Sequence, residues 1–154
     1  MEPFPPTSAA LEDPNGLLAV GGDLSATRLL EAYKRGIFPW YEPGEPILWW
    51  TPQPRAVLRP NQFHESKSLR KFMKTTDWRV DYDQRFEQVI EACAAPSPGR
   101  EATWISDDMK AAYLELHRLG YAHSVEILDH DCLVGGLYGV KLGKIFFGES
   151  MFSH

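Results

Sequence analysis

The stretch AHSVEILDHDCLVGGLYGVKLGKIFFGESMF, residues 122–152, decides the fold class of this chain. It contains three mostly apolar runs, 122–128, 132–140 and 144–152, and the short polar or glycine-containing breaks between them suit tight turns. Three strands joined in this way predict an antiparallel meander. The middle run holds several glycines, which inside a strand mark a bulge or the close approach of another group to the backbone.

Four helical patterns precede the meander. Each begins at a polar residue and carries apolar residues three or four positions apart, which places them on one buried face. Ser25 and Ser106 are the predicted caps. The starts and their buried stripes are Ser25 with Leu29, Leu30 and Tyr33; Ser66 with Leu69, Phe72 and Met73; Asp83 with Phe86, Val89, Ile90 and Cys93; and Ser106 with Met109, Ala112, Tyr113 and Leu116. Short strands are predicted at 17–20 and 78–82. Helices followed by a meander predict an α+β fold.

Residues 36–54, GIFPWYEPGEPILWWTPQP, carry five prolines and five aromatic residues. Because proline fixes φ and lacks a backbone donor, we expect an ordered irregular segment here, neither a helix interior nor a central strand. Tryptophan rings on a stiff backbone suit a platform for stacking bases. Burial of the same rings in the core is the alternative.

Composition bounds the class of protein. A chain of 154 residues with 44% hydrophobic residues suits one domain with a small appendage. No apolar run approaches the roughly 20 residues of a membrane span, and the N-terminus lacks the features of a signal peptide. Cys93 and Cys132 have no partner motif, so we expect free thiols in a reducing cytoplasm. The five histidines show no metal-ligand spacing, so no metal site is predicted.

Charge is unevenly spread along the chain. The net charge of −5 argues against a wholly basic nucleic-acid binder. One region nevertheless holds seven basic residues against two acidic ones, a local excess of five, and it is either a solvated helix face or a phosphate-binding patch. The seven are Arg55, Arg59, Lys67, Arg70, Lys71, Lys74 and Arg79.

Five blocks of sequence, in order along almost the whole chain, resemble the leucyl/phenylalanyl-tRNA–protein transferase family. They are PNGLLAVGGDLS (14–25), RGIFPWYEPGEPILWWTPQPRAVL (35–58), TWIS (103–106), LVGGLYGV (133–140) and FGESMFS (147–153). The resemblance implies transfer of Leu or Phe, and less readily Met, from aminoacyl-tRNA to the α-amine of proteins with N-terminal Arg or Lys. Such proteins are marked for N-degron proteolysis. A cytoplasmic monomer without a cofactor is implied.

The resemblance also implies an architecture. Residues 1–56 form a small N-terminal domain, and residues 57–154 are the first part of an acetyltransferase-like (GNAT-like) domain. Family members continue past GESMFS. We therefore expect the second domain to be incomplete in this chain, the strand at 144–152 to be an exposed edge, and the 154-residue form to be inactive.

Site residues are carried over by position. Trp40 and Trp104 match the family's adenosine-stacking tryptophans, and Leu137 and Phe146 match positions that line the pocket for the amino-acid side chain. Glu149 matches the floor of the aminoacyl pocket, and we interpret it as the catalytic carboxylate. From the residues alone, a carboxylate among apolar neighbours is costly unless paired, and backbone donors could satisfy it without any catalytic role.

Two other functions remain open at this stage. A coenzyme-A-dependent GNAT acetyltransferase would carry the phosphate-cradling signature (Q/R)xxGx(G/A), which does not occur in 1–154. A non-catalytic module for RNA ends would bind charged and uncharged tRNA equally. Because no Ser-His-Asp or Cys-His constellation is visible, direct attack of the amine on the aminoacyl ester is the favoured chemistry. Trp49 and Trp50 are interpreted as structural.

Overall fold

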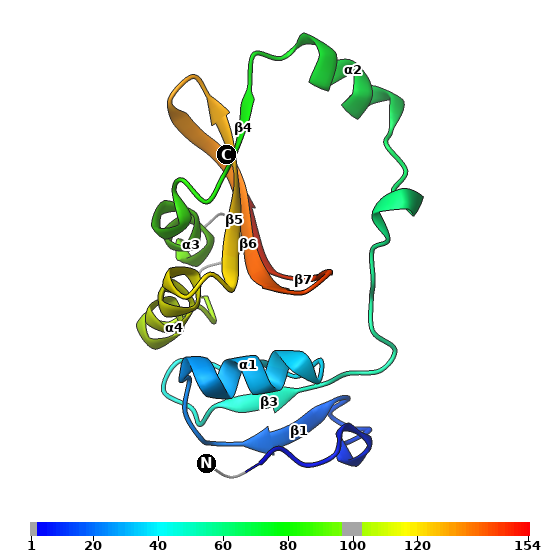
Figure 1. The fold of residues 1–154 in the computed structure, drawn as a ribbon, viewed down its shortest axis with the longest axis vertical. Helices are drawn as coiled ribbons and strands as arrows, with labels where there is room; N and C mark the ends of the chain where they lie inside the picture. The colour runs from blue at the N-terminus through cyan, green and yellow to red at the C-terminus, as the bar shows by residue number, and fades with distance from the viewer. Residues whose placement is uncertain (1–2, 97–102) are drawn as a thin grey trace.

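The computed structural model describes residues 3–96 and 103–154. It contains two antiparallel sheets and four α-helices, so the predicted α+β class is confirmed. Figure 1 shows a small N-terminal unit beneath a larger sheet that carries two helices on one face. The helices are α1 (Ala26–Lys34), α2 (Lys67–Thr75), α3 (Phe86–Ala94) and α4 (Asp107–Arg118).

The N-terminal sheet has the strand order β1-β3-β2, with β1 at Leu17–Val20, β3 at Leu48–Trp50 and β2 at Phe38–Pro39. The expectation that 36–54 holds no central strand is therefore wrong, because β3 pairs on both sides. The reason is local: 47–51 contains no proline, so its backbone donors are available to both neighbours. Pro39 lies in the edge strand β2, where a missing donor is tolerated.

Trp49 anchors this unit. Its side chain is completely buried, its Nε1 donates to the Gly21 carbonyl at 2.8 Å, and the Phe4 ring meets it edge-on at 4.9 Å. The Arg28 guanidinium lies 3.7 Å from the Phe4 ring centroid on the same side of the core. Trp49 is thus a core residue, as interpreted from the sequence.

The larger sheet has the order β4-β5-β6-β7 and is antiparallel throughout. Its strands are β4 (Arg79–Tyr82), β5 (Ala122–Asp129), β6 (Cys132–Leu142) and β7 (Ile145–Ser153). The predicted meander is confirmed, and the predicted strand near 78–82 adds to its β5 edge. Helices α3 and α4 cover one face of this sheet, and α1 of the N-terminal unit lies against its lower end (Figure 1).

Helix α2 lies where a helix was predicted, and Ser66 caps it: its Oγ accepts from the Leu69 amide at 3.2 Å. The predicted burial of its apolar stripe is wrong, since Leu69, Phe72 and Met73 are all exposed. The helix lies at the end of the extended stretch 51–66, away from α3 and α4 (Figure 1). An amphipathic pattern predicts which face is apolar but not whether a neighbour covers it.

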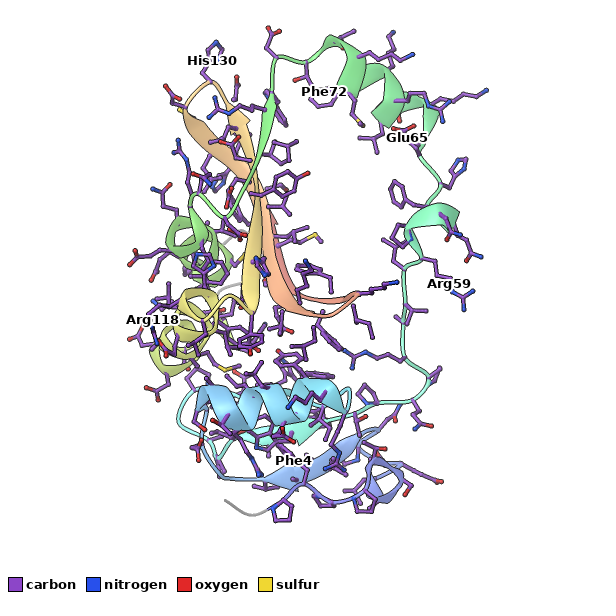
Figure 2. All side chains as sticks on the ribbon, in the orientation of Figure 1. Phe4, Arg59, Glu65, Phe72, Arg118 and His130 are labelled. Carbon is purple, nitrogen blue, oxygen red and sulfur yellow. The ribbon has the colours of Figure 1, made fainter. Side chains whose placement is uncertain are left out.

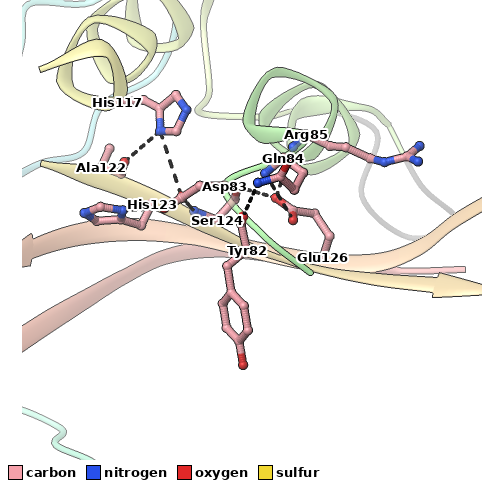
Figure 3. A network of polar contacts seen from close by, with 9 residues as sticks. All are labelled: Tyr82, Asp83, Gln84, Arg85, His117, Ala122, His123, Ser124 and Glu126. Atoms are coloured by element: carbon pink, nitrogen blue, oxygen red, sulfur yellow. Dashed lines mark hydrogen bonds and ion pairs between the residues drawn. The ribbon is translucent and has the colours of Figure 1, made fainter. Parts of the chain in front are cut away.

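The start of α3 also differs from its prediction. Asp83 adopts a left-handed conformation with φ of 56° instead of opening the helix, which begins at Phe86. The buried Glu126 on β5 caps the helix in its place: it accepts from the amides of Gln84 at 3.5 Å and Arg85 at 3.3 Å (Figure 3). A carboxylate at this end satisfies orphan donors and complements the helix dipole.

A second carboxylate fastens the same turn. Asp83 Oδ1 accepts from the Ser124 amide at 2.8 Å, and Asp83 Oδ2 lies 2.7 Å from His123 Nδ1 (Figure 3). The β4–α3 turn is therefore tied to β5 by Asp83 as well as by Glu126. The apolar stripes predicted for α3 and α4 are buried, except that Ala112 is half-buried.

Cys93 is buried and Cys132 is exposed, and no disulfide joins them in the described part of the chain. That both stay reduced is still a prediction. The loop expected at 94–103 falls largely outside the described residues. Among the helices that the structure describes, none is long and apolar enough to cross a membrane.

Candidate active site

A pocket of about 300 Å³ lies where the N-terminal unit meets β7. Four of the residues predicted for the site line it: Trp40, Arg55, Trp104 and Glu149. They come from the end of β2, the stretch after β3, the turn before α4, and β7. Phe38, Pro39 and Gly148 complete its lining.

Trp40 presents its ring to solvent at the mouth of this pocket, with 48% of its surface exposed. Its amide donates to the Leu48 carbonyl at 3.0 Å, and its carbonyl accepts from Trp50 Nε1 at 2.7 Å. The Trp50 ring meets the Trp40 ring at 5.9 Å and 62°. Trp40 is thus a held, accessible ring and not a core residue, and Trp50 acts as its support.

Trp104 is half-buried and immediately precedes the Ser106 cap of α4. Its carbonyl accepts from the Ser106 amide at 3.0 Å, which fixes the turn that carries it. The two tryptophans are 64 residues apart in sequence, yet both line the same pocket.

Glu149 is placed by a bulge in β7. Tyr138 pairs with Ser150 and Gly139 pairs with Gly148, which leaves Glu149 as the extra residue. Its Oε1 accepts from the Tyr33 hydroxyl at 2.6 Å and its Oε2 from the Tyr113 hydroxyl at 3.2 Å.

The two tyrosine hydroxyls also contact each other at 2.5 Å. Tyr33 belongs to α1 and Tyr113 to α4, so three elements from both units converge on one carboxylate. The alternative that backbone donors satisfy Glu149 is therefore not what the structure shows, because both of its donors are tyrosine side chains.

Electrostatics single out this carboxylate. Burial raises the pKa of Glu149 to about 7, against the hydrogen bonds from Tyr33 and Tyr113 and the charge of Arg55, which lower it. Burial, followed by the negative charge of Glu149, raises the pKa of both tyrosines well above the ordinary value. Each phenol therefore keeps its proton and acts as a donor. A carboxyl group that titrates near neutral pH beside a pocket is a candidate for proton transfer.

Sequence reasoning missed both tyrosines as site residues, because it assigned them to the apolar stripes of their helices. A signal was available: a buried tyrosine usually needs a partner for its hydroxyl, so a tyrosine in a buried stripe points to a nearby acceptor.

The hydroxyl of Tyr138, also buried, has no hydrogen-bond partner among residues 3–96 and 103–154.

Leu137 and Phe146 are not brought into this pocket. Tyr138 faces the helices, with its ring 5.5 Å from Tyr113, so the neighbouring Leu137 points to the other face of the sheet. Phe146 is 46% exposed, and its ring lies against Gly139 on that same face. Their predicted role in binding the amino-acid side chain stays a prediction.

The remaining basic residues lie outside the pocket. Arg70 Nε pairs with Glu65 at 2.8 Å and Arg79 Nε with Asp81 at 3.1 Å. Figure 2 shows Arg59 on the extended stretch and Glu65 at the start of α2. Of the seven basic residues between 55 and 79, Arg55 lines the pocket and four others are exposed with no ion pair in the part of the chain that the structure describes: Arg59, Lys67, Lys71 and Lys74.

A larger hollow of about 910 Å³ lies between residues 41–47 and the start of α4. Two of its four carboxylates have local roles: Asp23 accepts from the Ser25 amide, and Asp107 pairs with Lys110 at 2.9 Å. The described residues contain no group of three or more acidic, histidine or cysteine side chains that could hold a metal ion. The smaller pocket, with its rings and its titrating carboxyl, is the better candidate site.

Comparison with known proteins agrees with this geometry. A family model described as leucyl/phenylalanyl-tRNA protein transferase matches residues 57–154, and the model of that family's N-terminal domain matches residues 22–53. Three curated relatives carry the name leucyl/phenylalanyl-tRNA–protein transferase. That of Pseudomonas syringae is 59% identical over 150 residues, that of Xanthomonas euvesicatoria 59% over 152, and that of Azotobacter vinelandii 57% over 151.

These matches cover 97 to 98% of this chain and 61 to 67% of the relatives, so the chain spans about two thirds of their length. Both units of the fold are included, and the matched ranges contain every residue of the pocket except Arg55, which lies between the two ranges. The chain belongs to the leucyl/phenylalanyl-tRNA protein transferase family.

Proposed function

We propose that this chain forms part of an enzyme that transfers Leu or Phe, and less readily Met, from aminoacyl-tRNA to the α-amine of proteins with N-terminal Arg or Lys. The modified proteins enter N-degron proteolysis in the cytoplasm. The observation that carries the proposal is the single pocket shared by Trp40, Trp104 and Glu149. It offers two rings for a terminal adenosine beside one carboxylate for an amine.

The chemistry needs little beyond positioning. The aminoacyl ester is an activated acyl donor, and an α-amine with a pKa near ~7.7–8 is partly neutral at physiological pH. The amine nitrogen attacks the ester carbonyl carbon, the C–N bond forms, and the C–O bond to the ribose breaks. Holding both substrates together supplies several kcal/mol of the acceleration.

Glu149 has two candidate roles in this step. Its carboxylate can accept a hydrogen bond from an α-ammonium, or it can take the proton that the attacking amine loses. The second role requires a raised pKa, and burial of Glu149 raises it to about 7. The proton can then pass to the ribose oxygen that leaves. Tyr33 and Tyr113 hold the carboxylate in one orientation for either role.

We also propose that residues 57–154 begin a GNAT-like domain and that 1–56 form the small N-terminal domain. The order β4-β5-β6-β7, with two helices on one face, supports the first part. The amino-acid side chain is proposed to bind beside Leu137 and Phe146. Gly148 lines the pocket from β7, and a Cβ placed there would meet no atom within 4 Å, so there is open space beside the strand.

Binding of a leucyl-adenosine analogue tests the stacking site. Trp40→Ala should weaken its binding by about 1–3 kcal/mol, or roughly 5- to 150-fold in Kd, with a small change in stability. Trp78→Ala is the matched control, because Trp78 is similarly exposed but packs on Phe72 far from the pocket. Equal losses in the two variants would refute the site. Equal affinity for charged and uncharged tRNA would return the chain to a module that binds RNA ends.

The exposed basic residues are proposed to contact the tRNA backbone without reading sequence. Replacing Lys71 and Lys74 by Ala should flatten the dependence of log Kd on log salt by about one unit for each lost contact at most. Arg118→Ala is the control, because this exposed arginine on α4 pairs with Glu115. An unchanged slope for the lysine variant would make α2 a solvated helix face.

A further inference from the structure

Arg55 differs from the other basic residues of its region. Its guanidinium carbon lies 4.7 Å from the centroid of the Phe38 ring, and both side chains line the pocket that holds Trp40 and Trp104. Among residues 3–96 and 103–154, the Arg55 guanidinium has no hydrogen-bond or ion-pair partner, unlike Arg35, Arg70 and Arg79. Its five donors are therefore available to a ligand.

The position of the guanidinium limits what it can bind. Stacking on Phe38 restrains the plane of the fork, so less conformational entropy is lost when it engages an oxyanion. The one carboxylate that lines the same pocket, Glu149, already accepts hydrogen bonds from Tyr33 and Tyr113. A planar fork with free donors, beside two rings, matches a ligand that joins a flat base to a phosphate.

We infer that Arg55 forms an anion subsite of the pocket and binds the 5′-phosphate of the nucleotide whose base lies at Trp40 and Trp104. The class of ligand is a nucleoside 5′-phosphate, which in an RNA 3′ end is the phosphodiester before the last nucleoside. The inference rests on the proposed function. It separates Arg55, which places the terminal nucleotide, from the exposed residues of α2, which lie outside the pocket.

Titration calorimetry with adenosine, adenosine 5′-monophosphate and adenosine 3′-monophosphate tests the inference at pH 8. The wild-type chain should bind the 5′-monophosphate roughly tenfold more tightly than adenosine, because a charge-assisted bidentate contact is added. The 3′-monophosphate should gain little. Arg55→Ala should abolish the preference for the 5′-phosphate and leave adenosine affinity within about twofold, since the stacking rings remain. Arg118→Ala, which removes an equal charge on α4 outside the pocket, should keep the preference.

A second variant excludes an indirect effect through the carboxylate. In a Glu149→Gln background, Arg55→Ala should still remove the preference for the 5′-phosphate. The inference is overturned if Arg55→Ala keeps that preference, if the 3′-monophosphate binds equally well, or if the effect disappears with Glu149→Gln. If adenosine binding depends on Trp40 but the 5′-phosphate adds no affinity, the inference about Arg55 is overturned and the proposed function is not. Absence of all binding would overturn the proposed function as well.

Discussion

Two carboxylates on the larger sheet, Glu126 and Glu149, show how the same side chain serves two purposes. Glu126 is completely buried and accepts from the amides of Gln84 and Arg85, which precede α3, and from the Ser124 hydroxyl at 2.5 Å. Glu149 accepts from the hydroxyls of Tyr33 and Tyr113 and also lines a pocket.

The difference lies in what the donors can do. The backbone amides of Gln84 and Arg85 are part of the turn that leads into α3 and cannot turn away without rebuilding it, so Glu126 is committed to holding this turn. A phenol hydroxyl can rotate toward another acceptor while its ring stays packed. Glu149 can therefore exchange partners with a substrate at small cost, while Glu126 cannot. A buried carboxylate becomes a candidate site residue when its donors are side chains and its open side faces a cavity.

The largest expected effect is on stability. Glu126→Ala should lower the free energy of unfolding by roughly 3 kcal/mol, because it leaves two amides and one hydroxyl without their acceptor in the interior. Urea unfolding followed by circular dichroism measures this loss. Glu87→Ala in the first turn of α3 is the control, since Glu87 is exposed and should cost far less.

Adenosine binding by the folded Glu126→Ala variant completes this test. Affinity should stay within about twofold of the wild type, because Glu126 lies outside the pocket. A large loss of binding at full folding would contradict the division between a structural and a functional carboxylate.

The second effect is on catalysis. In a full-length family member, the change that matches Glu149→Gln should raise the activation free energy by about 2 kcal/mol, because a charged acceptor is lost. The value of kcat/KM should fall roughly 30-fold. Because both roles need the ionised carboxylate, the wild-type rate should fall below the Glu149 pKa of about 7, and this part of the acidic limb should be absent from the variant, which keeps only the limb of the α-amine near ~7.7–8. Identical pH profiles for the two enzymes would show that ionisation of Glu149 is not required.

Stability against pH gives an independent readout for this chain. The pKa of Glu149 is raised from 4.5 to about 7 by burial, so between those values the folded state holds more protons than the unfolded state. Wild-type stability should therefore fall as pH rises through this window, and Glu149→Gln should lack this fall. The variant then gains relative stability toward pH 7. Parallel stability curves would show that Glu149 is not buried as a titrating group.

These contrasts also show what the sequence could and could not reveal. The caps at Ser25 and Ser106 and the meander were predictable, because caps, periodicity and turns are local signals. The central place of β3 was not, since it depends on pairing with two strands distant in sequence. The exposure of the α2 stripe was missed for the same reason: burial depends on the partner.

The site divides in the same way. Trp40, Trp104 and Glu149 were assigned by resemblance, and the structure places all three on one pocket. Tyr33 and Tyr113 lie on two helices with ordinary apolar stripes, and only the packing of α1 against α4 brings their hydroxyls to Glu149. The Glu126 cap escaped notice because Asp83 offered a local cap, and the left-handed turn there moved the start of α3.

Removing one tyrosine hydroxyl should have a smaller effect than removing the charge. Tyr33→Phe removes a hydrogen bond that lowers the pKa of Glu149, so this pKa should rise and any acidic limb should move to higher pH. At pH values above the acidic limb, kcat/KM should fall roughly fivefold, which corresponds to about 1 kcal/mol of activation free energy. Tyr113→Phe should shift the limb less, because its contact with Glu149 is longer, at 3.2 Å against 2.6 Å. A limb that moved to lower pH would contradict this arrangement.

The smallest effect comes from the matched hydroxyl on the other carboxylate. Ser124 is buried, and its Oγ donates to Glu126 Oε1, so Ser124→Ala deletes one hydroxyl donor from Glu126 just as Tyr113→Phe deletes one from Glu149. Because two amides remain on Glu126, the loss in unfolding free energy should be about 1 kcal/mol. The pH profile of transfer and the binding of adenosine should not move. If Ser124→Ala shifted the pH profile as Tyr113→Phe does, the two carboxylates would be coupled through the sheet, and the assignment of separate roles would fail.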